Sequence, residues 1–533
     1  MTSASPNLDL RDRARLFAAL EAGVFDVAVI GGGITGAGIA RDVAMRGLSV
    51  ALVEARDFAA GTSSRSSKLV HGGIRYLAQG DMALVREAAL ERKTVRTIAP
   101  HLARRTLFIV PAHSRAGIAK FRTGLWTYEK LGSVEADDRH ELWNVERVAR
   151  EEPSLDTSTL SGAIVYPEYI TDDARLTLAN VRSARGYGAI VANYAEVTAV
   201  ECANGIAQAL TVTDGLTQGT TARVRARVIV NAAGPWADHI RHLERADAGV
   251  RLALSKGVHL VVSRERLPVN HTVTMTAADK RGVFVVPRGA VAYIGTTDTF
   301  YQGSAYWPTI TGGDVDYLLD AANRVFRTQP LTRGDVIGLW SGIRPLIAEP
   351  GNKSPSELSR RDEVMEGPTG IITIAGGKLT AYRRMAERIA DLCNKRLGRN
   401  GPPSTTASEP LPGGDLRESP AALTQRLIAT GLNARAADRL LMLYGAEAIS
   451  LTGGAADEAR HAVLCEGALT LEDYWVRRSA RARFDLDGGI AALQPAADAM
   501  APLLGWSPAE AARQIETCRA IRAAERAPLD RHD

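Results

Sequence analysis

The apolar positions of the first residues predict a helix, and then a strand, a helix and a second strand. The helix covers residues 8–24, where apolar side chains recur at helical spacing. Its apolar face consists of Leu16, Phe17, Leu20 and Val24. The run FDVAVI then ends in glycines, as a buried parallel strand does where it meets a turn. GITGAGIARDVAMRG has helical spacing, closes at Gly47 and precedes the strand LSVALVE, so these three segments predict a βαβ unit.

Later patterns predict alternating strands and helices, followed by a separate helical unit. RARVIVNAAGPWADHI is typical of a strand that ends at Asn231, a turn of small residues and the start of a helix. RGVFVVPRGAVAYIGTTD predicts a hairpin, and GIITIAGGKLTAYRRMAERIADLCNKRLG predicts a strand, a Gly-Gly turn and a long helix. Residues 399–414 are rich in Pro, Gly, Ser and Thr, which predicts a linker. The Ala-, Leu- and Arg-rich sequence beyond it predicts a small helical domain.

Length and charge narrow the functional class. A chain of 533 residues exceeds one ordinary core, so we expect two or three structural units. The net charge of +5 comes from 65 basic and 60 acidic side chains, a mixed surface that is not typical of a nucleic-acid-binding protein. A mild basic excess suits an anionic substrate or an anionic membrane surface.

Cysteine spacing and hydropathy indicate the compartment. The four cysteines are far apart and form no CxxC pair, so we expect neither a disulfide framework nor a metal site. No apolar run approaches the roughly 18–20 residues of a membrane-spanning helix. The N-terminal sequence lacks the pattern of a signal or transit peptide. We therefore expect a soluble or peripheral intracellular protein.

The fragment GGGITG contains the pattern Gly31-x-Gly33-x-x-Gly36 in the context that dinucleotide binding requires. It follows a strand and opens a helix, whose N-terminal amides and positive dipole suit a pyrophosphate. Glu54 ends the next strand, where a carboxylate can accept hydrogen bonds from ribose hydroxyls. A generic turn with chance glycines would not combine all of these features, so we predict a dinucleotide site.

The stretch EARDFAAGTSSRSSKLVHGGIRY distinguishes FAD from a nicotinamide cofactor. A nicotinamide enzyme normally continues into another helix, whereas a hydroxyl-rich loop can hydrogen-bond along an extended FAD toward its isoalloxazine ring. Alone, such a loop is more often a solvated turn. Two further glycine-containing turns, NAAGPW and AGGKLTAYR, also follow strands, and Lys378 in the second would stabilise negative charge on a reduced flavin.

Eight ordered motifs, between about Asp26 and Lys395, resemble the FAD-dependent glycerol-3-phosphate dehydrogenases, within the group similar to D-amino-acid and glycine oxidases. They are VIGGGITGAGIARD, TSSRSSKLVHGGIRYL, YITDDARLTLAN, NAAGPWAD, SKGVHLVV, IGTTD, SGIRPL and AGGKLTAYRRMAE. EDYWVRRSARARFDLDGG resembles the helical cap that these dehydrogenases carry and the broader oxidases lack. Thr35 stands where many members have Asn, and we expect no change of cofactor from it.

The resemblance implies an α/β fold with a Rossmann-type FAD-binding domain, a mixed-sheet substrate domain and a C-terminal helical cap domain. The FAD-binding domain would comprise residues 1–80, 161–250 and 361–398. The substrate domain would comprise 81–160 and 251–360. The linker would be 399–414 and the cap 415–533.

The resemblance also implies the site residues. The cofactor side would consist of Gly31, Gly33, Ile34, Thr35, Gly36, Glu54, Ala55, Thr62, Ser63, Ser64, Ser67, Lys68, Leu69, His71, Gly72, Ala233, Gly234, Trp236, Gly377, Lys378, Leu379 and Thr380. The substrate side would consist of Arg75, Tyr76, His259, Arg344, Lys378 and Thr380. Of these, His259, Arg344 and Arg75 would be catalytic. Arginine suits a phosphate because its planar fork donates two parallel hydrogen bonds.

The implied reaction is oxidation of sn-glycerol 3-phosphate to dihydroxyacetone phosphate, with hydride transfer to flavin N5 and electron transfer to ubiquinone or menaquinone. His259 is the first candidate base, because neutral imidazole is poised near pH 7. One alternative is an oxidase of the same fold, which would use O₂ on glycerol 3-phosphate, an amine or a hydroxy acid. Another is a non-catalytic FAD-binding or tRNA-modifying protein, which the absence of a CxxC pair and of a basic stripe disfavours.

The expected location is cytoplasmic, with peripheral attachment to the cytoplasmic face of the inner (plasma) membrane. A homodimer is considered as well, and no nucleic-acid partner is expected. Two segments are candidates for the membrane-facing surface. One is the helix at 8–24. The other is the arginine run Arg477, Arg478, Arg481 and Arg483 beside Trp475 and Phe484, for which a solvated helix face or a cap–core contact is the alternative.

Overall fold

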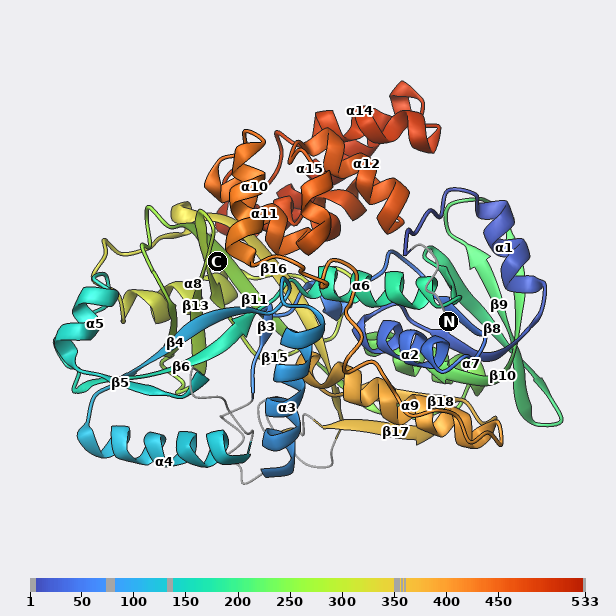
Figure 1. The fold of residues 1–533 in the computed structure, drawn as a ribbon, viewed down its shortest axis with the longest axis horizontal. Helices are drawn as coiled ribbons and strands as arrows, with labels where there is room; N and C mark the ends of the chain where they lie inside the picture. Colours follow the sequence, from blue (N-terminus) through green and yellow to red (C-terminus); the bar gives the residue numbers. More distant parts are fainter. Residues whose placement is uncertain are drawn as a thin grey trace.

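Two β-sheets and a C-terminal helical domain make up the fold of the computed structural model (Figure 1). The structure describes residues 6–72, 82–131, 138–348, 355, 358 and 361–530. This arrangement confirms the predicted α/β fold with a helical C-terminal domain.

The first sheet contains the predicted βαβ unit. Its strands, in spatial order, are β17 (Asp362–Glu366), β18 (Ile372–Gly376), β10 (Thr221–Asn231), β1 (Val24–Ile30), β2 (Val50–Val53) and β7 (Ile190–Ala192). From β18 to β7 every neighbouring pair is parallel. The antiparallel strands β8 (Ala195–Ala203) and β9 (Ile206–Asp214) extend from β10. Parallel pairing brings the carboxyl ends of β1, β2, β10 and β18 to one edge, where open α/β sheets bind ligands.

Helices cover both faces of this sheet. Alternation along β1 sends Val27 and Val29 to one face and Ala28 and Ile30 to the other, because successive side chains in a strand point to opposite sides. On the first face lie α2 (Ile34–Met45), α6 (Asp173–Gly186) and α9 (Tyr382–Arg396). On the second face lie α1 (Arg13–Glu21) and α7 (Ala237–Glu244).

The second sheet is mixed. Its strands, in order, are β15 (Thr299–Phe300), β11 (Leu252–Ser263), β14 (Val291–Gly295), β13 (Gly282–Arg288), β12 (Thr272–Thr276), β4 (Arg104–Ala112), β6 (Gly162–Ile170) and β3 (Leu69–Val70). β16 (Val336–Ile347) pairs with β11, and β5 (Glu141–Trp143) pairs with β6. The predicted hairpin is β13 and β14. Helices α5 (Val145–Glu151) and α8 (Gly312–Asn323) pack on this sheet, and α3 (Met82–Ile98) and α4 (Arg115–Leu131) contact each other nearby.

The cap, defined here as residues 415–530, has its own apolar cores. It comprises α10 (Pro420–Ala429), α11 (Ala434–Tyr444), α12 (Ala455–Glu466), a π-helical segment (Asp473–Arg478), α13 (Arg481–Phe484), α14 (Leu493–Leu504) and α15 (Pro508–Asp530). In Figure 1 it is drawn in orange and red above the two sheets. It packs against α6 of the first sheet and β16 of the second, and so bridges the two halves.

The proposed segment boundaries differ from the strand pairing at two places. β3 and β6 belong to the second sheet, whereas the predicted segments put their residues with the cofactor-binding domain. The predicted linker also packs against the core. Leu411 is buried in an apolar cluster, and Arg41 of α2 donates hydrogen bonds to the carbonyls of Thr406 and Glu409. A composition rich in turn residues predicts irregular backbone, but it does not tell whether that backbone is solvated.

Both candidate membrane-facing surfaces are wrong. The helix begins after Asp12, whose side chain caps the amide of Arg15, and ends at Glu21. Its apolar side chains Phe17 and Leu20 are buried against the first sheet, so they are not available to a lipid surface. Val24 is outside the helix, at the start of β1.

The arginine run is a cap–core contact, the alternative considered for it. Arg477 and Arg478 are 1% and 0% exposed. Both pair with the buried carboxylate of Asp57, which follows β2. The positive charge of these two arginines, which had suggested contact with an anionic membrane, is thus paired with a carboxylate from a distant part of the chain. None of the helices in the described ranges has the length and hydropathy to cross a membrane.

Candidate functional site

A cavity of about 1170 Å³ lies where the carboxyl edge of the first sheet meets the second sheet. Residues after β1, β2, β10 and β18 line it on one side. Residues of β11, β13 and β16 line it on the other. The predicted motifs therefore converge although they are far apart in sequence.

Glycines shape the turn between β1 and α2. Gly31 has φ +106°, and a Cβ there would lie 2.6 Å from the carbonyl oxygen of Ala232. A Cβ at Gly36 would clash with the carbonyl oxygen of Gly31, so only glycine lets α2 pack this close to the turn. The amide of Ile34, at the start of α2, donates to Ser63 Oγ at 2.9 Å. Gly31, Gly33, Ile34 and Thr35 line the cavity, whereas Gly36 lies behind them as a packing residue.

Glu54 is held at the cavity wall by backbone amides. Its two carboxylate oxygens accept hydrogen bonds from Gly32 N at 2.6 Å and Arg56 N at 2.9 Å. Burial raises the pKa of Glu54, although these two amide donors oppose the shift. Glu54 and Ala55 both line the cavity, at the position that the βαβ pattern predicts for a ribose-binding carboxylate.

The hydroxyl-rich loop joins the two sheets. Of the predicted residues in it, the cavity is lined by Thr62, Ser63, Ser67, Leu69 and His71. Thr62 Oγ1 donates to the carbonyl oxygen of Ile343 in β16 at 2.6 Å, which fixes the loop against the second sheet.

Three predicted loop residues do not line the cavity. Ser64 is buried. The Lys68 ammonium is buried against Asp173, with 2.5 Å between Nζ and Oδ1. The amide of Gly72 donates to the carboxylate of Glu168. Ser64 and Lys68 support the loop with buried side chains, and Gly72 supports it through its backbone amide.

The other two turns close the cofactor side of the cavity. Ala233, Gly234 and Trp236 line it after β10, and Gly377, Lys378 and Leu379 line it after β18. Thr380 lies behind the wall and donates to the carbonyl oxygen of His71 at 3.1 Å, so it connects the last turn to the loop.

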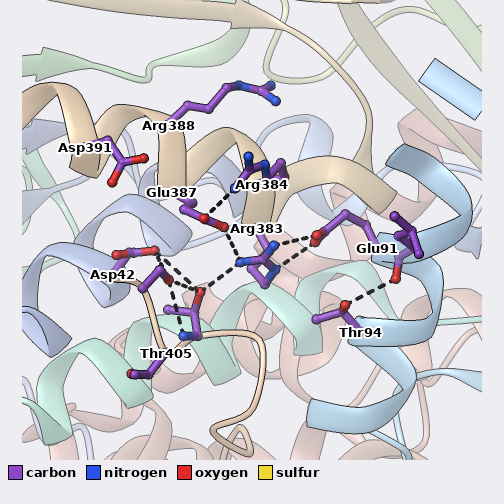
Figure 2. A network of polar contacts seen from close by, with 12 residues as sticks. Asp42, Glu91, Thr94, Arg383, Arg384, Glu387, Arg388, Asp391 and Thr405 are labelled. Atoms are coloured by element: carbon purple, nitrogen blue, oxygen red, sulfur yellow. Dashed lines mark hydrogen bonds and ion pairs between the residues drawn. The ribbon is translucent and has the colours of Figure 1, made fainter. Parts of the chain in front are cut away.

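Helix α9 starts at this last turn, and a buried ionic network holds it in place (Figure 2). Arg383, in its first helical turn, donates to both carboxylate oxygens of Glu91 in α3 and to Glu387 one turn further on. Asp42 of α2 accepts a hydrogen bond from Ser404 at 2.6 Å, next to the same cluster. The network therefore fixes the helices α2, α3 and α9 relative to one another behind the cavity.

His259 of β11 faces the cavity and is almost fully buried. Its Nε2 lies 2.8 Å from Ser67 Oγ, and its ring stacks on Trp340 with centroids 4.6 Å apart. A Cβ at Gly295 on the neighbouring strand would clash with this ring, so the glycine provides its space. Burial, with smaller contributions from Arg344 and Lys68, holds the pKa of His259 well below 6.5. The imidazole is therefore neutral at physiological pH.

Arg344 of β16 lies near His259. Its guanidinium donates to Thr296 Oγ1 at 3.2 Å and to the carbonyl oxygen of Thr297 at 3.4 Å, and it pairs with Asp298 Oδ1 at 3.2 Å. A Cβ at Gly257 would clash with the guanidinium, which therefore lies over this glycine. Gly257 and His259 are two residues apart on one strand, roughly 6.6 Å, and share a face. The Arg344 guanidinium and the His259 ring therefore lie on the same face of this sheet.

The sequence did not single out four Arg and Lys residues that line the cavity: Arg56, Arg65, Lys280 and Arg281. Arg65 is buried and stacks on Trp307, 3.7 Å from its guanidinium carbon to the ring centroid. Burial, with Arg483 nearby, lowers the pKa of Arg65 to about 10. No sequence signal marked them, because an arginine in a polar loop is normally solvated.

Arg75 and Tyr76 lie outside the described residues. Among the residues that the structure describes, no cluster of three or more His, Cys, Asp or Glu side chains could hold a metal ion.

Comparisons with known proteins agree with this geometry. Residues 26–383 match the family described as FAD dependent oxidoreductase, and residues 404–511 match the C-terminal domain of alpha-glycerophosphate oxidase. The aerobic glycerol-3-phosphate dehydrogenase of Bacillus subtilis is 38% identical over 504 residues, 89% of this chain and 90% of that protein. That of Staphylococcus aureus is 38% identical over 514 residues, 91% of this chain and 92% of that protein.

Solved structures extend the comparison. A glycerol-3-phosphate dehydrogenase from Bacillus halodurans, complexed with FAD, has a TM-score of 0.82 and 34% identity, covering 98% of this chain and 100% of that chain. An L-alpha-glycerophosphate oxidase from Mycoplasma pneumoniae, with FAD bound, has a TM-score of 0.57 and 18% identity, covering 73% and 99%. The second likeness concerns the fold alone.

Proposed function

The chain belongs to the family of FAD-dependent aerobic glycerol-3-phosphate dehydrogenases, and we propose that it oxidises sn-glycerol 3-phosphate to dihydroxyacetone phosphate. FAD supplies the oxidising chemistry by accepting a hydride at N5, and the electrons then pass to ubiquinone or menaquinone. The dehydrogenases are 34–38% identical over most of this chain, whereas the glycerophosphate oxidase is 18% identical, which favours this reaction over the oxidase alternative.

The described residues that line the cavity have the chemistry that is needed to hold FAD. Gly33 lies at the N-terminus of α2, where a Cβ would come within 3.2 Å of Ser63 Oγ and narrow the space for a pyrophosphate. Glu54 is placed to accept hydrogen bonds from a ribose. Lys378, at the turn before α9, would place a positive charge beside the flavin ring.

His259 and Arg344 would handle the substrate. The neutral imidazole would accept the proton of the C2 hydroxyl, with Ser67 orienting the ring through its 2.8 Å contact. The Arg344 guanidinium would bind the phosphate, because its donors already lie along one wall of the cavity. The observation that carries the proposal is that both side chains share one sheet face, directly opposite the dinucleotide turn.

An anaerobic titration tests this function. Purified protein with bound FAD should lose its flavin absorption when glycerol 3-phosphate is added, and an equal amount of glycerol should cause little change. A flavin that stays oxidised with glycerol 3-phosphate would contradict the assignment. The oxidase alternative is tested separately, because it requires stoichiometric peroxide in air-saturated buffer, whereas we expect little peroxide and fast turnover when a quinone is supplied.

The acceptor and the location are part of the same proposal. A quinone is a membrane component, so the protein would attach peripherally to the cytoplasmic face of the inner membrane, whether as a monomer or as a homodimer. High salt or mild detergent should then release activity from a membrane pellet. Release only by conditions that dissolve integral proteins would contradict peripheral attachment.

A further inference from the structure

Arg281 lies next to Arg344 at the cavity wall, although it comes from a different strand. It immediately precedes β13, and its Nη1 donates to the backbone carbonyl oxygen of Asp298 at 2.5 Å. Arg344 pairs with the side-chain carboxylate of the same Asp298 at 3.2 Å. Both arginines line the cavity, so a single residue holds two guanidinium groups on one side of it.

The strand register explains this convergence. Phe284 of β13 and Gly295 of β14 form the end pair of their ladder, and Arg281 and Asp298 each lie three residues beyond it, at the same end of the two strands. β11 lies on the other side of β14 and brings Gly257, over which Arg344 lies. The arrangement therefore follows from sheet pairing rather than from proximity in sequence.

The turn before β13 fixes the Arg281 backbone. The amide of Ala277 donates to the carbonyl oxygen of Arg281 at 2.9 Å, and Lys280 has φ +66°. The carboxylate of Asp279 lies 3.2 Å from Arg281 Nε. The side chains of this ion pair are 33% and 42% exposed. Exposed pairs contribute little free energy, so the guanidinium can turn toward another anion at small cost.

The charges favour an anionic ligand. Arg344, Arg281 and Lys280 bring three positive charges to this wall, against the two carboxylates of Asp298 and Asp279. The Asp298 carboxylate also accepts a hydrogen bond from Ser255, so Arg344 shares this acceptor with a second donor. A phosphate monoester carries about −1.5 to −2 charge and three acceptor oxygens at pH 7, which suits two guanidinium forks.

We propose that Arg281 binds the phosphate group of the substrate together with Arg344 and so sets the preference for a phosphorylated polyol. The inference rests on the proposed function and adds a specificity-determining residue to it. In this arrangement Arg281 contacts the phosphate, and His259 of β11 contacts the reacting hydroxyl.

The test compares Arg281→Met and Arg281→Lys with wild type in steady-state assays with an artificial dye as acceptor. Arg281→Met should lower kcat/KM for glycerol 3-phosphate roughly 10- to 100-fold, the effect of losing one charge-assisted hydrogen bond. The change should appear mainly in KM, and turnover of glycerol should change less than about twofold, because glycerol has no phosphate. Arg281→Lys should recover part of the loss, since an ammonium keeps the charge without the planar fork.

Arg324→Met is the matched control. Arg324 also forms an exposed ion pair with an aspartate, Asp320, but it follows the last residue of helix α8 and does not line the cavity. Its replacement should leave both substrates unaffected. A binding measurement complements the kinetics: inorganic phosphate should perturb the bound flavin spectrum with a dissociation constant that rises at least tenfold in Arg281→Met.

The outcomes separate this inference from the proposed function. If glycerol 3-phosphate fails to reduce the wild-type flavin anaerobically, the proposed function is wrong. If the wild-type flavin is reduced but Arg281→Met keeps kcat/KM and phosphate binding within twofold of wild type, Arg281 does not bind the phosphate. An equal loss for glycerol and glycerol 3-phosphate would also overturn the role, since it would place the effect on the hydroxyl or on folding.

Discussion

The arginines of the cap and those of the cavity differ in what surrounds them. Arg477 reaches Asp57, Glu472 and Asp473 at 2.5–2.7 Å, and its side chain is 1% exposed. Arg344 contacts Asp298 at 3.2 Å, and its side chain is 23% exposed. It also donates to neutral oxygens of Thr296 and Thr297 at 3.2–3.4 Å.

The difference shows how position assigns a role to a residue type. In the cap, Arg477 donates short hydrogen bonds to carboxylates, and these bonds hold two parts of the chain together. In the cavity, Arg344 contacts a carboxylate at a longer distance, together with neutral oxygens, and its side chain stays partly exposed at the wall of the cavity. The arginine-rich segment that looked most suited to an anionic surface is the one that a ligand cannot reach.

The histidines of the two regions follow the same rule. At His461 of the cap, burial lowers the pKa, but Cys465 and Glu466 outweigh it and raise the value to about 9. At His259 of the cavity, burial, Arg344 and Lys68 all act in the same direction and lower the pKa. Nearby acids therefore raise the pKa of the cap histidine, whereas burial, together with two nearby bases, lowers the pKa of the cavity histidine.

The largest expected effect comes from removing the acid at the cap contact. Asp57→Ala leaves Arg477 and Arg478 buried without their shared partner, which should cost about 3–5 kcal/mol of stability. The lost free energy of unfolding is measured by chemical denaturation at saturating FAD, monitored with one probe in the cap and one in the core. Burial raises the pKa of Asp57, but Arg478 and Arg477 outweigh it and lower the value. The stabilisation is thus present above the ordinary aspartate pKa of 3.8 and disappears as pH falls below it.

If Asp57→Ala is as stable as wild type, the cap arginines do not have the structural role that distinguishes them from those of the cavity. Catalysis offers a second check, since Asp57 does not line the cavity. Protein that remains folded should keep its KM for glycerol 3-phosphate. A change in KM without a change in stability would mean that the cap contact acts on the site and not on the assembly of the fold.

The next largest effect concerns Arg344, which we propose to bind the substrate phosphate. Truncating one partner of such a contact typically costs ~2–5 kcal/mol, so Arg344→Met should lower kcat/KM for glycerol 3-phosphate by roughly 30-fold or more. FAD content should not change, and turnover of glycerol should fall much less. Arg344→Lys should recover only part of the loss. Equal losses for both substrates in dye-linked assays would instead place Arg344 at the reacting hydroxyl or in folding.

Local signals explain what the sequence could predict. The glycine turn was recognisable because Gly31 and Gly36 meet steric limits set within a few residues. A cap–core contact was one of the alternatives for the arginine run, but its partner was not recognisable, because Arg478 and Asp57 are 421 residues apart and nothing near either one marks the other. Arg281 was missed for a related reason: its link to Arg344 passes through the register of neighbouring strands, which a single sequence does not specify.

A smaller effect is expected for an exposed ion pair between the cap and the second sheet. Arg104 of β4 and Asp438 of α11 are 2.5 Å apart, with side chains 39% and 51% exposed. Asp438→Asn should cost only ~0.2–1 kcal/mol, because water screens both charges. The measurement is the denaturation midpoint at low and high salt, and the small difference should shrink with salt. A loss comparable with that of Asp57→Ala would show that burial is not what distinguishes the two contacts.

The smallest effect is expected in the pH profile of the wild-type enzyme. With the pKa of His259 well below 6.5, the proposed base is already neutral at pH 6, so kcat/KM should vary less than about twofold between pH 6 and 8. Glycerol is the substrate to use, because the second pKa of a phosphate ester near 6 would add its own dependence for glycerol 3-phosphate. Arg344→Met removes one of the positive charges that lower the pKa, so the acid limb should move upward toward 6.5 in that variant. An acid limb near pH 6.5–7 in wild type that does not move in Arg344→Met would contradict His259 as the base. The base would then be another group of the cavity, which His71 also lines.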